Sequence, residues 1–485
     1  MAGIGFQLRR LSDEDNLLAP MASIGHAAII ATGPWIFTVT ALQLITSFSS
    51  RLIPVETLGG FRLVIIYSFA LSLVVTAPIV IVAARMVGDA IYINAYHRIK
   101  PLYVAALLLS GCGAGAVALL VYIMFGLPLK VAMAGSSCCG LVALIWVGLS
   151  FCGAVRDYVT ITFGFITGLA VAVVGAVATA RSVPEVAAII YAFDCGLVII
   201  VCTLTSRILT TFPHPMGDPI KPLQALCHGI KRFWMLALGG FISALAIWAD
   251  KWVVWSGPAG ERHALGLFHA PFYDSAMFTA CLVAIPALAL FVTHIETAFF
   301  EKHHAYYKAI RNHATLRQIE QIAAQLSQET FRSISNITLI QAAICCMAVL
   351  VAPSLIEVAG LQYRQIGILR FGILGSLFQF VFFASTSLLL FFERYAHFLA
   401  LQTTFLVLQV VLTAISVRLG AEYYGTGNLI ACLICGLLAA AVLERTLKNL
   451  TYNTFRSASR QQSGKIENDL LEFDQRQRRT TGGLS

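Results

Sequence analysis

The sequence is short of charged residues. Only 12% of its 485 residues are Asp, Glu, Lys or Arg, whereas a soluble globular domain carries roughly 25%. This shortage excludes a water-soluble protein of this length. The hydrophobic residues, 58% of the chain, fall in separate runs of about 20, each long enough to cross the ~30 Å hydrocarbon core of a bilayer. The composition therefore indicates a polytopic membrane protein.

The chain also lacks the motifs of several pump and enzyme classes. It has no GxxxxGK[ST] phosphate-binding loop and no HExxH zinc motif, so we expect neither an ATP-driven pump nor a metalloprotease. Its 12 cysteines form no pair of CxxC motifs and no Cys/His ligand spacing, which indicates small buried hydrophobes rather than disulfides or a metal site. His303-His304 beside Glu301 is interpreted mainly as an interfacial polar cap. We expect no cofactor, no metal and no enzymatic activity.

Twelve apolar runs follow one another along the chain. They lie at residues 22–48, 61–84, 102–125, 131–153, 159–180, 186–205, 233–255, 274–298, 335–359, 366–392, 398–417 and 428–444. Each has the length expected of one membrane-spanning helix. The sequence thus predicts an all-α membrane protein with about 12 transmembrane helices.

Lysine and arginine are unevenly distributed between the loops. If the N-terminus is cytoplasmic, 24 of the 33 lie in cytoplasmic segments and nine lie outside. The positive-inside rule supports this orientation, and an even number of spans places both termini in the cytoplasm. The same asymmetry accounts for the net charge of +9, so the charge does not require a nucleic-acid partner.

Polar segments divide the chain. Residues 206–232 contain four prolines, cannot form one uninterrupted helix, and predict a cytoplasmic linker between two six-helix bundles, residues 1–205 and 233–449. Within the second bundle, residues 299–332 carry apolar side chains at helical spacing. This pattern fits an amphipathic helix on the membrane or on a partner, or a helical hairpin packed under the bundle. The Gln-, Ser- and Arg-rich segment 450–485 predicts a disordered tail.

Ionisable residues inside the spans are candidates for transport or gating, because each costs several kcal/mol in hydrocarbon unless it is paired or hydrated. Asp194 lies near the middle of the sixth run and fits either a hydrogen bond between helices or a polar cavity. Asp250 and Lys251 lie near the end of the seventh run, Asp274 begins the eighth, and Arg370 lies in the first turns of the tenth. These four share a depth on the outer side. We expect ion pairs among them, for example Asp250 or Asp274 with Arg370, forming either an outer gate or a static salt bridge.

Prolines inside the spans are candidate hinges. Gly33-Pro34 lies about halfway along the first run, and Pro78 and Pro286 interrupt the second and eighth. Because proline removes a backbone hydrogen bond, each position predicts a kink that acts as a hinge or as a passive bend.

Three sets of residues carry a resemblance to a known family. They are the opening MAGIGFQLR before Gly33-Pro34-Trp35; IWADKW at 247–252 with Tyr273-Asp274; and IPALALF at 285–291 followed by Ile295-Glu296-Thr297 and Tyr306-Tyr307. Together they resemble the PelG family, inner-membrane transporters of the Pel exopolysaccharide system. Glu296, within the third set, is a further candidate transport residue.

The resemblance implies a fold and a function. The fold is that of the MOP flippase superfamily, with two six-helix bundles around a central cavity that work by alternating access. The implied substrate is a hexosamine-rich polymer or its lipid-linked precursor. The implied partners are a PelF-type cytoplasmic glycosyltransferase, a PelD-type cyclic-di-GMP receptor and a PelE-type membrane protein, and the basic segment 299–332 is a candidate docking site for the synthase.

Two other functions are consistent with the composition. A drug or ion antiporter of the same fold would export small cations without a synthase. A membrane-embedded transferase acting on lipid-linked sugars would need a His or carboxylate cluster facing a cavity, and the sequence offers only the weak His303-His304 group.

Overall fold

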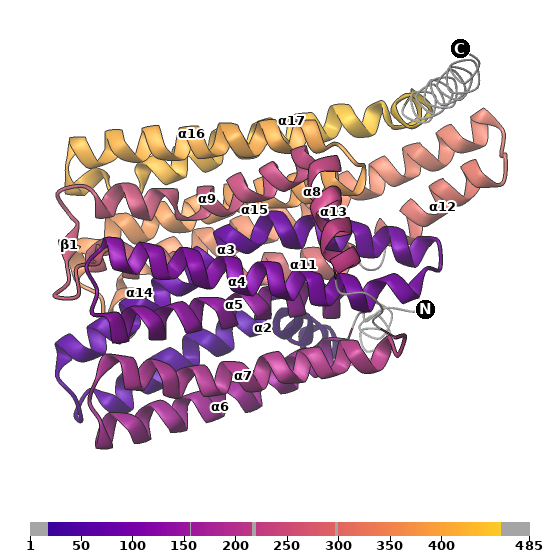
Figure 1. The fold of residues 1–485 in the computed structure, drawn as a ribbon. Coiled ribbons are helices and arrows are strands. Elements are labelled where there is room, and N and C mark those ends of the chain that lie inside the picture. The colour runs from indigo at the N-terminus through magenta and orange to yellow at the C-terminus, as the bar shows by residue number, and fades with distance from the viewer. Residues whose placement is uncertain (1–17, 156, 216–219, 296–298, 457–485) are drawn as a thin grey trace, which may run out of the picture.

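The computed structural model describes residues 18–155, 157–215, 220–295 and 299–456. Within these residues, ten helices are long and apolar enough to cross a membrane, or eleven if one bent pair counts as a single span. Helices dominate because backbone N–H and C=O groups in hydrocarbon must be paired within their own segment. Figure 1 shows the long helices running side by side along one axis.

The first half of the chain forms a bundle of long helices. They are α2 (Leu18–Ser49), α3 (Val55–Tyr92), α4 (Ile99–Met124), α5 (Leu129–Val155), α6 (Tyr158–Ser182) and α7 (Val186–Thr211), with the short 3-10 helix η1 (Tyr96–Arg98) before α4. Helices α4 to α7 pack on one another and on α3, while α2 packs against α6.

The second half begins with a short helix outside the bundles and continues with a second bundle. Its elements are α8 (Ile220–Arg232), α9 (Trp234–Trp255), strands β1 (Glu261–Arg262) and β2 (Phe268–His269), α10 (Pro271–Leu282), α11 (Ile285–His294), α12 (Phe300–Arg311), α13 (Leu316–Leu350), α14 (Ala352–Val358), η3 (Tyr363–Gln365), α15 (Ile366–Phe391), α16 (Tyr395–Leu419), η4 (Ala421–Tyr423) and α17 (Thr426–Lys448). The two strands pair antiparallel, Glu261 opposite His269.

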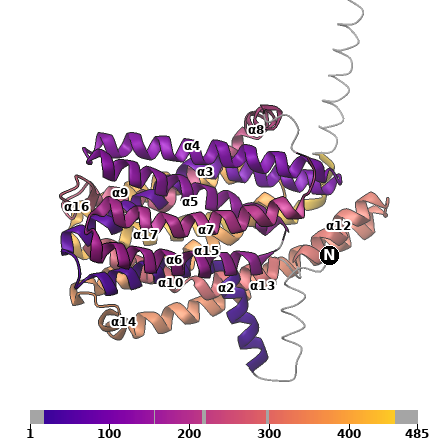
Figure 2. The same cartoon turned by 60° about the horizontal axis from the view of Figure 1, so that its bottom comes forward.

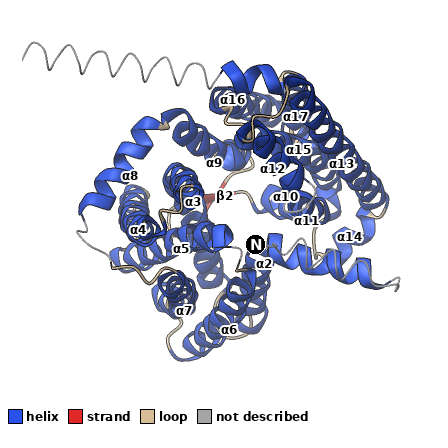
Figure 3. Cartoon of the chain, turned by 90° about the vertical axis from the view of Figure 1, so that its right-hand side faces the viewer, coloured by secondary structure: helices blue, strands red, loops and turns tan. Residues whose placement is uncertain are grey.

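The two groups of helices are distinct when viewed along the bundle axis. Figure 3 shows α3 to α7 on one side and α10 to α17 on the other. The groups meet where α3 packs on α9 and where α2 packs on α11. This arrangement confirms the predicted all-α membrane fold of two bundles.

Close helix contacts depend on small residues. A Cβ at Gly196 in α7 would collide with the backbone of Gly168 and Ala172 in α6. Glycine at this position therefore allows the two helices to approach backbone to backbone, which increases dispersion contact where lipid supplies no hydrophobic driving force.

The ends of the bundles carry different structures. One end, called here the hairpin end, carries the turn of β1 and β2 between α9 and α10. The opposite end, called here the linker end, carries α8 and the start of α13. Two tight turns at the linker end use residues with positive φ, Asn94 (56°) after α3 and Glu393 (56°) between α15 and α16.

The predicted kinks have different outcomes. Pro286 lies at the start of α11, immediately after a 41° bend between α10 and α11, so the predicted kink in the eighth span is confirmed. Helices α2 and α3 continue through Pro34 and Pro78 without a break. In α2 the Thr38 hydroxyl donates to the Pro34 carbonyl oxygen at 2.8 Å.

Two observed boundaries differ from the predicted ranges. The ninth span ends at Leu350, where a Pro-containing turn starts α14, instead of running to residue 359. The segment 206–232 is not one uninterrupted helix, because α7 ends at Thr211 and a separate helix, α8, fills residues 220–232. Residues 450–456, predicted as the start of a disordered tail, are helical; Leu450 in this segment is 2% exposed and packs in the second bundle. Residues 457–485 lie outside the described residues.

Residues 299–332 form a helical hairpin rather than a single surface helix. Helix α12 packs against the first part of α13, which starts with a capping box in which the Thr315 side chain accepts from the Gln318 backbone. Ile319, Ala323 and Leu326 are buried on the inner face. Figure 2 shows α12 and the start of α13 extending beyond the other helices. Of the two predicted forms, the hairpin is the one observed.

Candidate functional site

A buried ion pair lies near the hairpin end of α9. Asp250 is 2% exposed, and the Nζ atom of Lys251 lies 3.1 Å from each of its carboxylate oxygens. The hydroxyl of Tyr273, from α10, donates to Oδ2 at 3.0 Å. Three donor contacts on one carboxylate offset part of the cost of burying its charge. The pair therefore ties α9 to α10 within the second bundle.

Asp274 ties the two ends of the strand turn together. The indole N–H of Trp255, the last residue of α9, donates to its two oxygens at 3.0 and 2.8 Å. The backbone N–H of Ala270 donates to Oδ2 at 3.1 Å. Trp255 precedes the turn and Ala270 ends it, so this one carboxylate closes the loop of residues 256–270 at its base.

The closed loop reaches across to the first bundle. The Tyr67 hydroxyl on α3 donates to the Phe268 carbonyl oxygen at 2.8 Å, and the Tyr67 ring stacks on Trp255 with centroids 5.2 Å apart. At the tip of the turn, Gly266 has φ +91°, and a Cβ there would collide with the Phe125 carbonyl oxygen of α4's C-cap. Residues 256–270 with Tyr67 are called the latch below.

A further contact of the latch lies at the start of α3. The His263 ring lies with Nε2 3.1 Å from the Glu56 carbonyl oxygen. Its Nδ1 accepts from the Leu265 backbone N–H at 3.2 Å. These contacts require a proton on Nε2, so they select one tautomer of the neutral ring.

The predicted pairing with Arg370 is wrong. Arg370 is exposed and forms none of the ion pairs found between described residues. Asp250 instead pairs with its sequence neighbour Lys251, and Asp274 is satisfied by an indole and a backbone N–H. Of the ion pairs expected among the four residues, the one observed joins sequence neighbours, because Lys251 supplies the cation locally.

Asp194 lies buried inside the first bundle. It is 5% exposed, and one carboxylate oxygen, Oδ2, accepts from the Ser137 hydroxyl of α5 at 2.6 Å. Its other oxygen, Oδ1, has no hydrogen-bond partner among the described atoms. Burial in this way strongly disfavours the charged carboxylate, and a proton would relieve the cost.

The linker end has a cross-bundle contact that sequence reasoning missed. Arg85, near the end of α3, pairs with Glu393 between α15 and α16 at 2.5 Å and with Asp89 at 3.3 Å. The positive φ of Glu393 turns the chain so that its side chain reaches the first bundle. Close by, the Arg311 guanidinium of α12 lies over the Tyr92 ring of α3, 5.6 Å from its centroid.

His303 of α12 lies in an aromatic cluster rather than in a metal site. Its ring centroid lies 4.8 Å from that of Tyr307, 5.5 Å from Phe299 and 5.9 Å from Phe392. Burial lowers the pKa of His303 to about 4, although a hydrogen bond to the Phe391 backbone opposes the shift. Among the residues that the structure describes, no three His, Cys, Asp or Glu side chains are grouped to hold a metal.

The remaining candidates are less constrained. Glu296 lies outside the described residues. Gly33 is buried in α2, and Pro34 and Pro78 lie within continuous helices, so their roles as hinges stay predictions.

The described contacts join the two bundles at both ends, through the latch at one and through Arg85 with Glu393 at the other. Either set can break without unfolding a helix, which is what alternate opening of the two ends requires.

Comparisons with known proteins agree with this architecture. The model of the PelG family, described as "Putative exopolysaccharide Exporter (EPS-E)", matches residues 1–455. No curated protein matches the chain.

Solved transporter structures share the fold. A MATE crystal structure in the straight conformation aligns with TM-score 0.64 and 14% identity, covering 88% of this chain and 96% of that one. MATE in the bent conformation aligns with TM-score 0.61 and 16% identity over 93% and 99%. A MOP superfamily transporter from Pyrococcus furiosus aligns with TM-score 0.61 and 15% identity over 88% and 96%.

Proposed function

Because the chain belongs to the PelG family of exopolysaccharide exporters, we propose that it moves a hexosamine-rich exopolysaccharide, or its lipid-linked precursor, across the bacterial cytoplasmic membrane by alternating access. The observation that carries the proposal is the family match over residues 1–455, which includes both bundles. The transporter fold shared with the MATE structures supports it.

The distribution of Lys and Arg orients the proposed mechanism. The positive-inside rule assigns the linker end to the cytoplasm and the hairpin end to the outside. In this orientation the latch is the outer gate, and it opens when Tyr67 leaves the Phe268 carbonyl. The Arg85 and Glu393 pair is the inner gate. Substrate enters while the inner pair is broken and leaves while the latch is open.

Asp194 and Asp250 are the proposed links to a driving ion. Asp194 has one oxygen without a described partner, which suits a group that takes up and releases a proton. Asp250 is neutralised by Lys251, and a proton or substrate that displaces the lysine would loosen α9 from α10 at the base of the latch. Both roles require that the carboxylate faces the transport cavity at some stage of the cycle.

Deletion of the gene and complementation test the proposed function. Extracellular and intracellular polysaccharide is measured with wild type and with the Asp194→Asn and Asp250→Asn variants. The matched control is Glu185→Gln, which changes an exposed carboxylate at the N-cap of α7 that makes no side-chain cap hydrogen bond. We expect loss of secreted polymer on deletion, with synthase present, and loss again in a stably expressed carboxylate variant but not in the control.

The alternative functions predict other results in the same experiment. Structural likeness to MATE transporters favours a small-cation antiporter as the second candidate. Unchanged secretion with raised drug or salt sensitivity would reject polysaccharide export and support that antiporter. Accumulation of an unmodified lipid-linked sugar, with transport of a synthetic polymer intact, would instead indicate a membrane-embedded transferase.

The helical hairpin of α12 and α13 is the proposed docking site for the PelF-type glycosyltransferase, in a complex that includes PelD-type and PelE-type proteins. Its tip carries the exposed basic residues Arg311 and Arg317. The double variant Arg311→Glu/Arg317→Glu should reduce recovery of the glycosyltransferase with the purified transporter. Arg364→Glu, an exposed arginine at the hairpin end, is the control. Equal recovery of the glycosyltransferase with the wild type, the double variant and the control would refute docking at this tip.

A further inference from the structure

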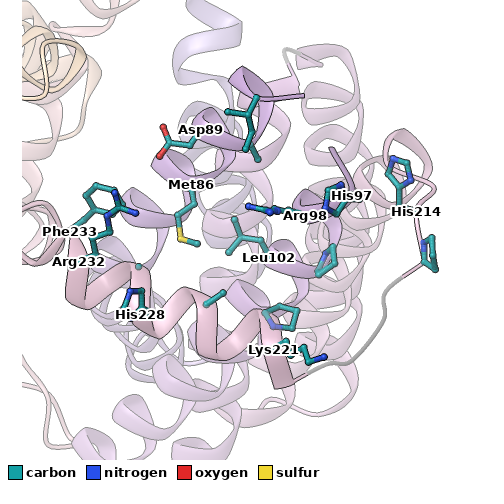
Figure 4. A pocket seen from close by; sticks show the side chains of 17 residues that line it. Met86, Asp89, His97, Arg98, Leu102, His214, Lys221, His228, Arg232 and Phe233 are labelled. Carbon is teal, nitrogen blue, oxygen red and sulfur yellow. The ribbon is translucent and has the colours of Figure 1, made fainter. Parts of the chain in front are cut away.

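A pocket of about 850 Å³ lies under the linker helix α8. Its walls come from the end of α3, from η1 and the start of α4, from α8, and from His214 and Pro215, which follow α7. Figure 4 shows α8 crossing in front of these elements, with Arg98 reaching toward the middle of the pocket between Met86 and Leu102.

The rim of the pocket is strongly basic. The lining residues that carry or can carry positive charge are Arg98, Lys221, Arg232, His97, His214 and His228. The lining includes one carboxylate, Asp89, which is already paired with Arg85 at 3.3 Å. None of the three rim cations Arg98, Lys221 and Arg232 takes part in an ion pair between described residues. The described pocket therefore has an excess of uncompensated positive charge.

The floor of the pocket is apolar. Met86, Ala90, Leu102 and Ala225 line it beneath the basic rim. Helix α8 is held over this floor because Leu226 and Gly229 are buried against α3 and α4, and a Cβ at Gly229 would collide with the Met86 sulfur. A basic rim above an apolar floor suits an amphiphile better than a small hydrated anion.

The position of the pocket matches a membrane surface. Helix α3 has 38 residues and so extends about 57 Å at 1.5 Å per residue, well beyond the ~30 Å hydrocarbon core. The pocket lies near the end of this helix, beyond the part that a hydrocarbon core would cover, where headgroups are expected. Figure 3 shows α8 at the outer rim of the molecule, crossing outside α4 and α3, where it faces lipid rather than the centre between the bundles.

We propose that this pocket binds the phosphate headgroup of an anionic phospholipid. The phosphate lies at Arg98, in the middle of the pocket, Lys221 and Arg232 near the two ends of α8 add to the positive potential, and the glycerol and first acyl carbons lie on the apolar floor. A bound lipid holds α8, the helix that follows α7 and precedes α9 in the chain, against the first bundle. This inference does not depend on the identity of the transported substrate.

Lipid titration of the full-length protein tests the proposal. Delipidated transporter is titrated in detergent with phosphatidylglycerol, and bound lipid is counted by native mass spectrometry. Basic residues near a membrane surface contribute about fivefold each, so Arg98→Gln/Lys221→Gln should weaken binding about 25-fold. The control Lys100→Gln/Lys231→Gln removes the same number of charges from neighbouring positions that do not line the pocket, and should weaken binding much less than the pocket variant. An equal loss in the control would overturn the proposal.

Two further experiments identify the ligand and the position of its binding site. Phosphatidylcholine should bind at least about tenfold more weakly than phosphatidylglycerol; equal binding refutes recognition of the negative charge. Glycerol 3-phosphate or inorganic phosphate displacing the lipid at similar concentration would show a soluble ligand instead. Ala225→Phe fills the floor without changing charge and should reduce lipid binding as the charge variant does, with thermal stability as the folding check. Retained binding in this variant would place the headgroup outside the pocket.

Discussion

Removing one oxygen atom, that of the Tyr67 hydroxyl, weakens the latch. In the variant Tyr67→Phe the ring stays stacked on Trp255, but the hydroxyl that donates to the Phe268 carbonyl is lost. Tyr67 is 7% exposed, and its hydrogen bond to Phe268 is partly buried, so the carbonyl loses its protein donor and is only partly hydrated in its place. The change leaves the strand pair and the Asp274 contacts in place. It therefore acts on the contact between the two bundles and not on the loop itself.

The size of the effect follows from the contact that is lost. Phe268 is 37% exposed, so water partly replaces the lost donor, and the hydrogen bond is worth about 0.5–1.5 kcal/mol net. Every 1.4 kcal/mol is a factor of ten in an equilibrium, so the population with the latch open should rise about twofold to tenfold. The same arithmetic predicts faster exchange of the turn's backbone amides, because those amides exchange through the open state.

Hydrogen exchange of residues 261–269 in lipid nanodiscs measures this population. Tyr103→Phe is the matched control, since it removes a hydroxyl bonded at 2.9 Å to Thr205 within the first bundle alone. We expect about twofold to tenfold faster exchange of the turn in Tyr67→Phe and no change there in the control. Unchanged exchange in Tyr67→Phe, or an equal rise in the control, would refute the assignment of the latch as a contact between bundles.

Three further predictions concern the other contacts. The variant Arg85→Glu should loosen the linker end and speed hydrogen exchange in the turn of residues 392–394. Adding Glu393→Arg should restore slow exchange, because the pair is then re-formed with its charges reversed. Fast exchange in the double variant would reject a direct pair. The pKa of His303 is about 4 in the fold and near 6.5 when unfolded, so the unfolded state takes up the proton first and stability of α12 is lost as pH falls through 6.5. Between pH 7 and 5 the loss of stability amounts to about 2 kcal/mol. Hydrogen exchange of α12 should therefore become faster at low pH in the wild type and in the control His304→Asn. It should not do so in His303→Leu, which has no imidazole to protonate. Gly196→Ala forces α6 from α7 and should cost about 1–3 kcal/mol, measured as a lower thermal midpoint; an unchanged midpoint would contradict the close backbone contact at this glycine.

The helices were predictable because their signal is local. A run of about 20 apolar residues must be a helix in a bilayer whatever surrounds it, so the predicted ranges fall on the observed long helices. The errors lie where local composition does not determine at which residue a helix begins or ends. Helix α13 continues without a break from the polar hairpin into the apolar span because Leu316 to Leu350 contain no proline or glycine, and hydropathy alone marks only its second part.

The site was predictable only in part, because its contacts join residues distant in sequence. Asp250, Lys251 and Asp274 were found because a charge in an apolar run is conspicuous. Their partners Tyr273 and Trp255 carry no such signal, since aromatic residues are common in membrane helices.

The contacts between bundles were even less visible to sequence analysis. Tyr67 and Phe268 are 201 positions apart. Arg85 and Glu393 lie at the linker end, where charges are expected for topology alone. Only the fold brings either pair together.

The two contacts between bundles also differ in strength, and this difference bears on the transport cycle. Arg85 and Glu393 are 33% and 48% exposed, and an ion pair so open to water contributes about 0.2–1 kcal/mol. The latch combines a partly buried hydrogen bond with ring stacking, worth about 0.5–1.5 kcal/mol each. On these contacts alone the linker end separates at a lower cost than the hairpin end. In the proposed orientation the linker end faces the cytoplasm, so these contacts favour opening toward the side from which the proposed substrate arrives.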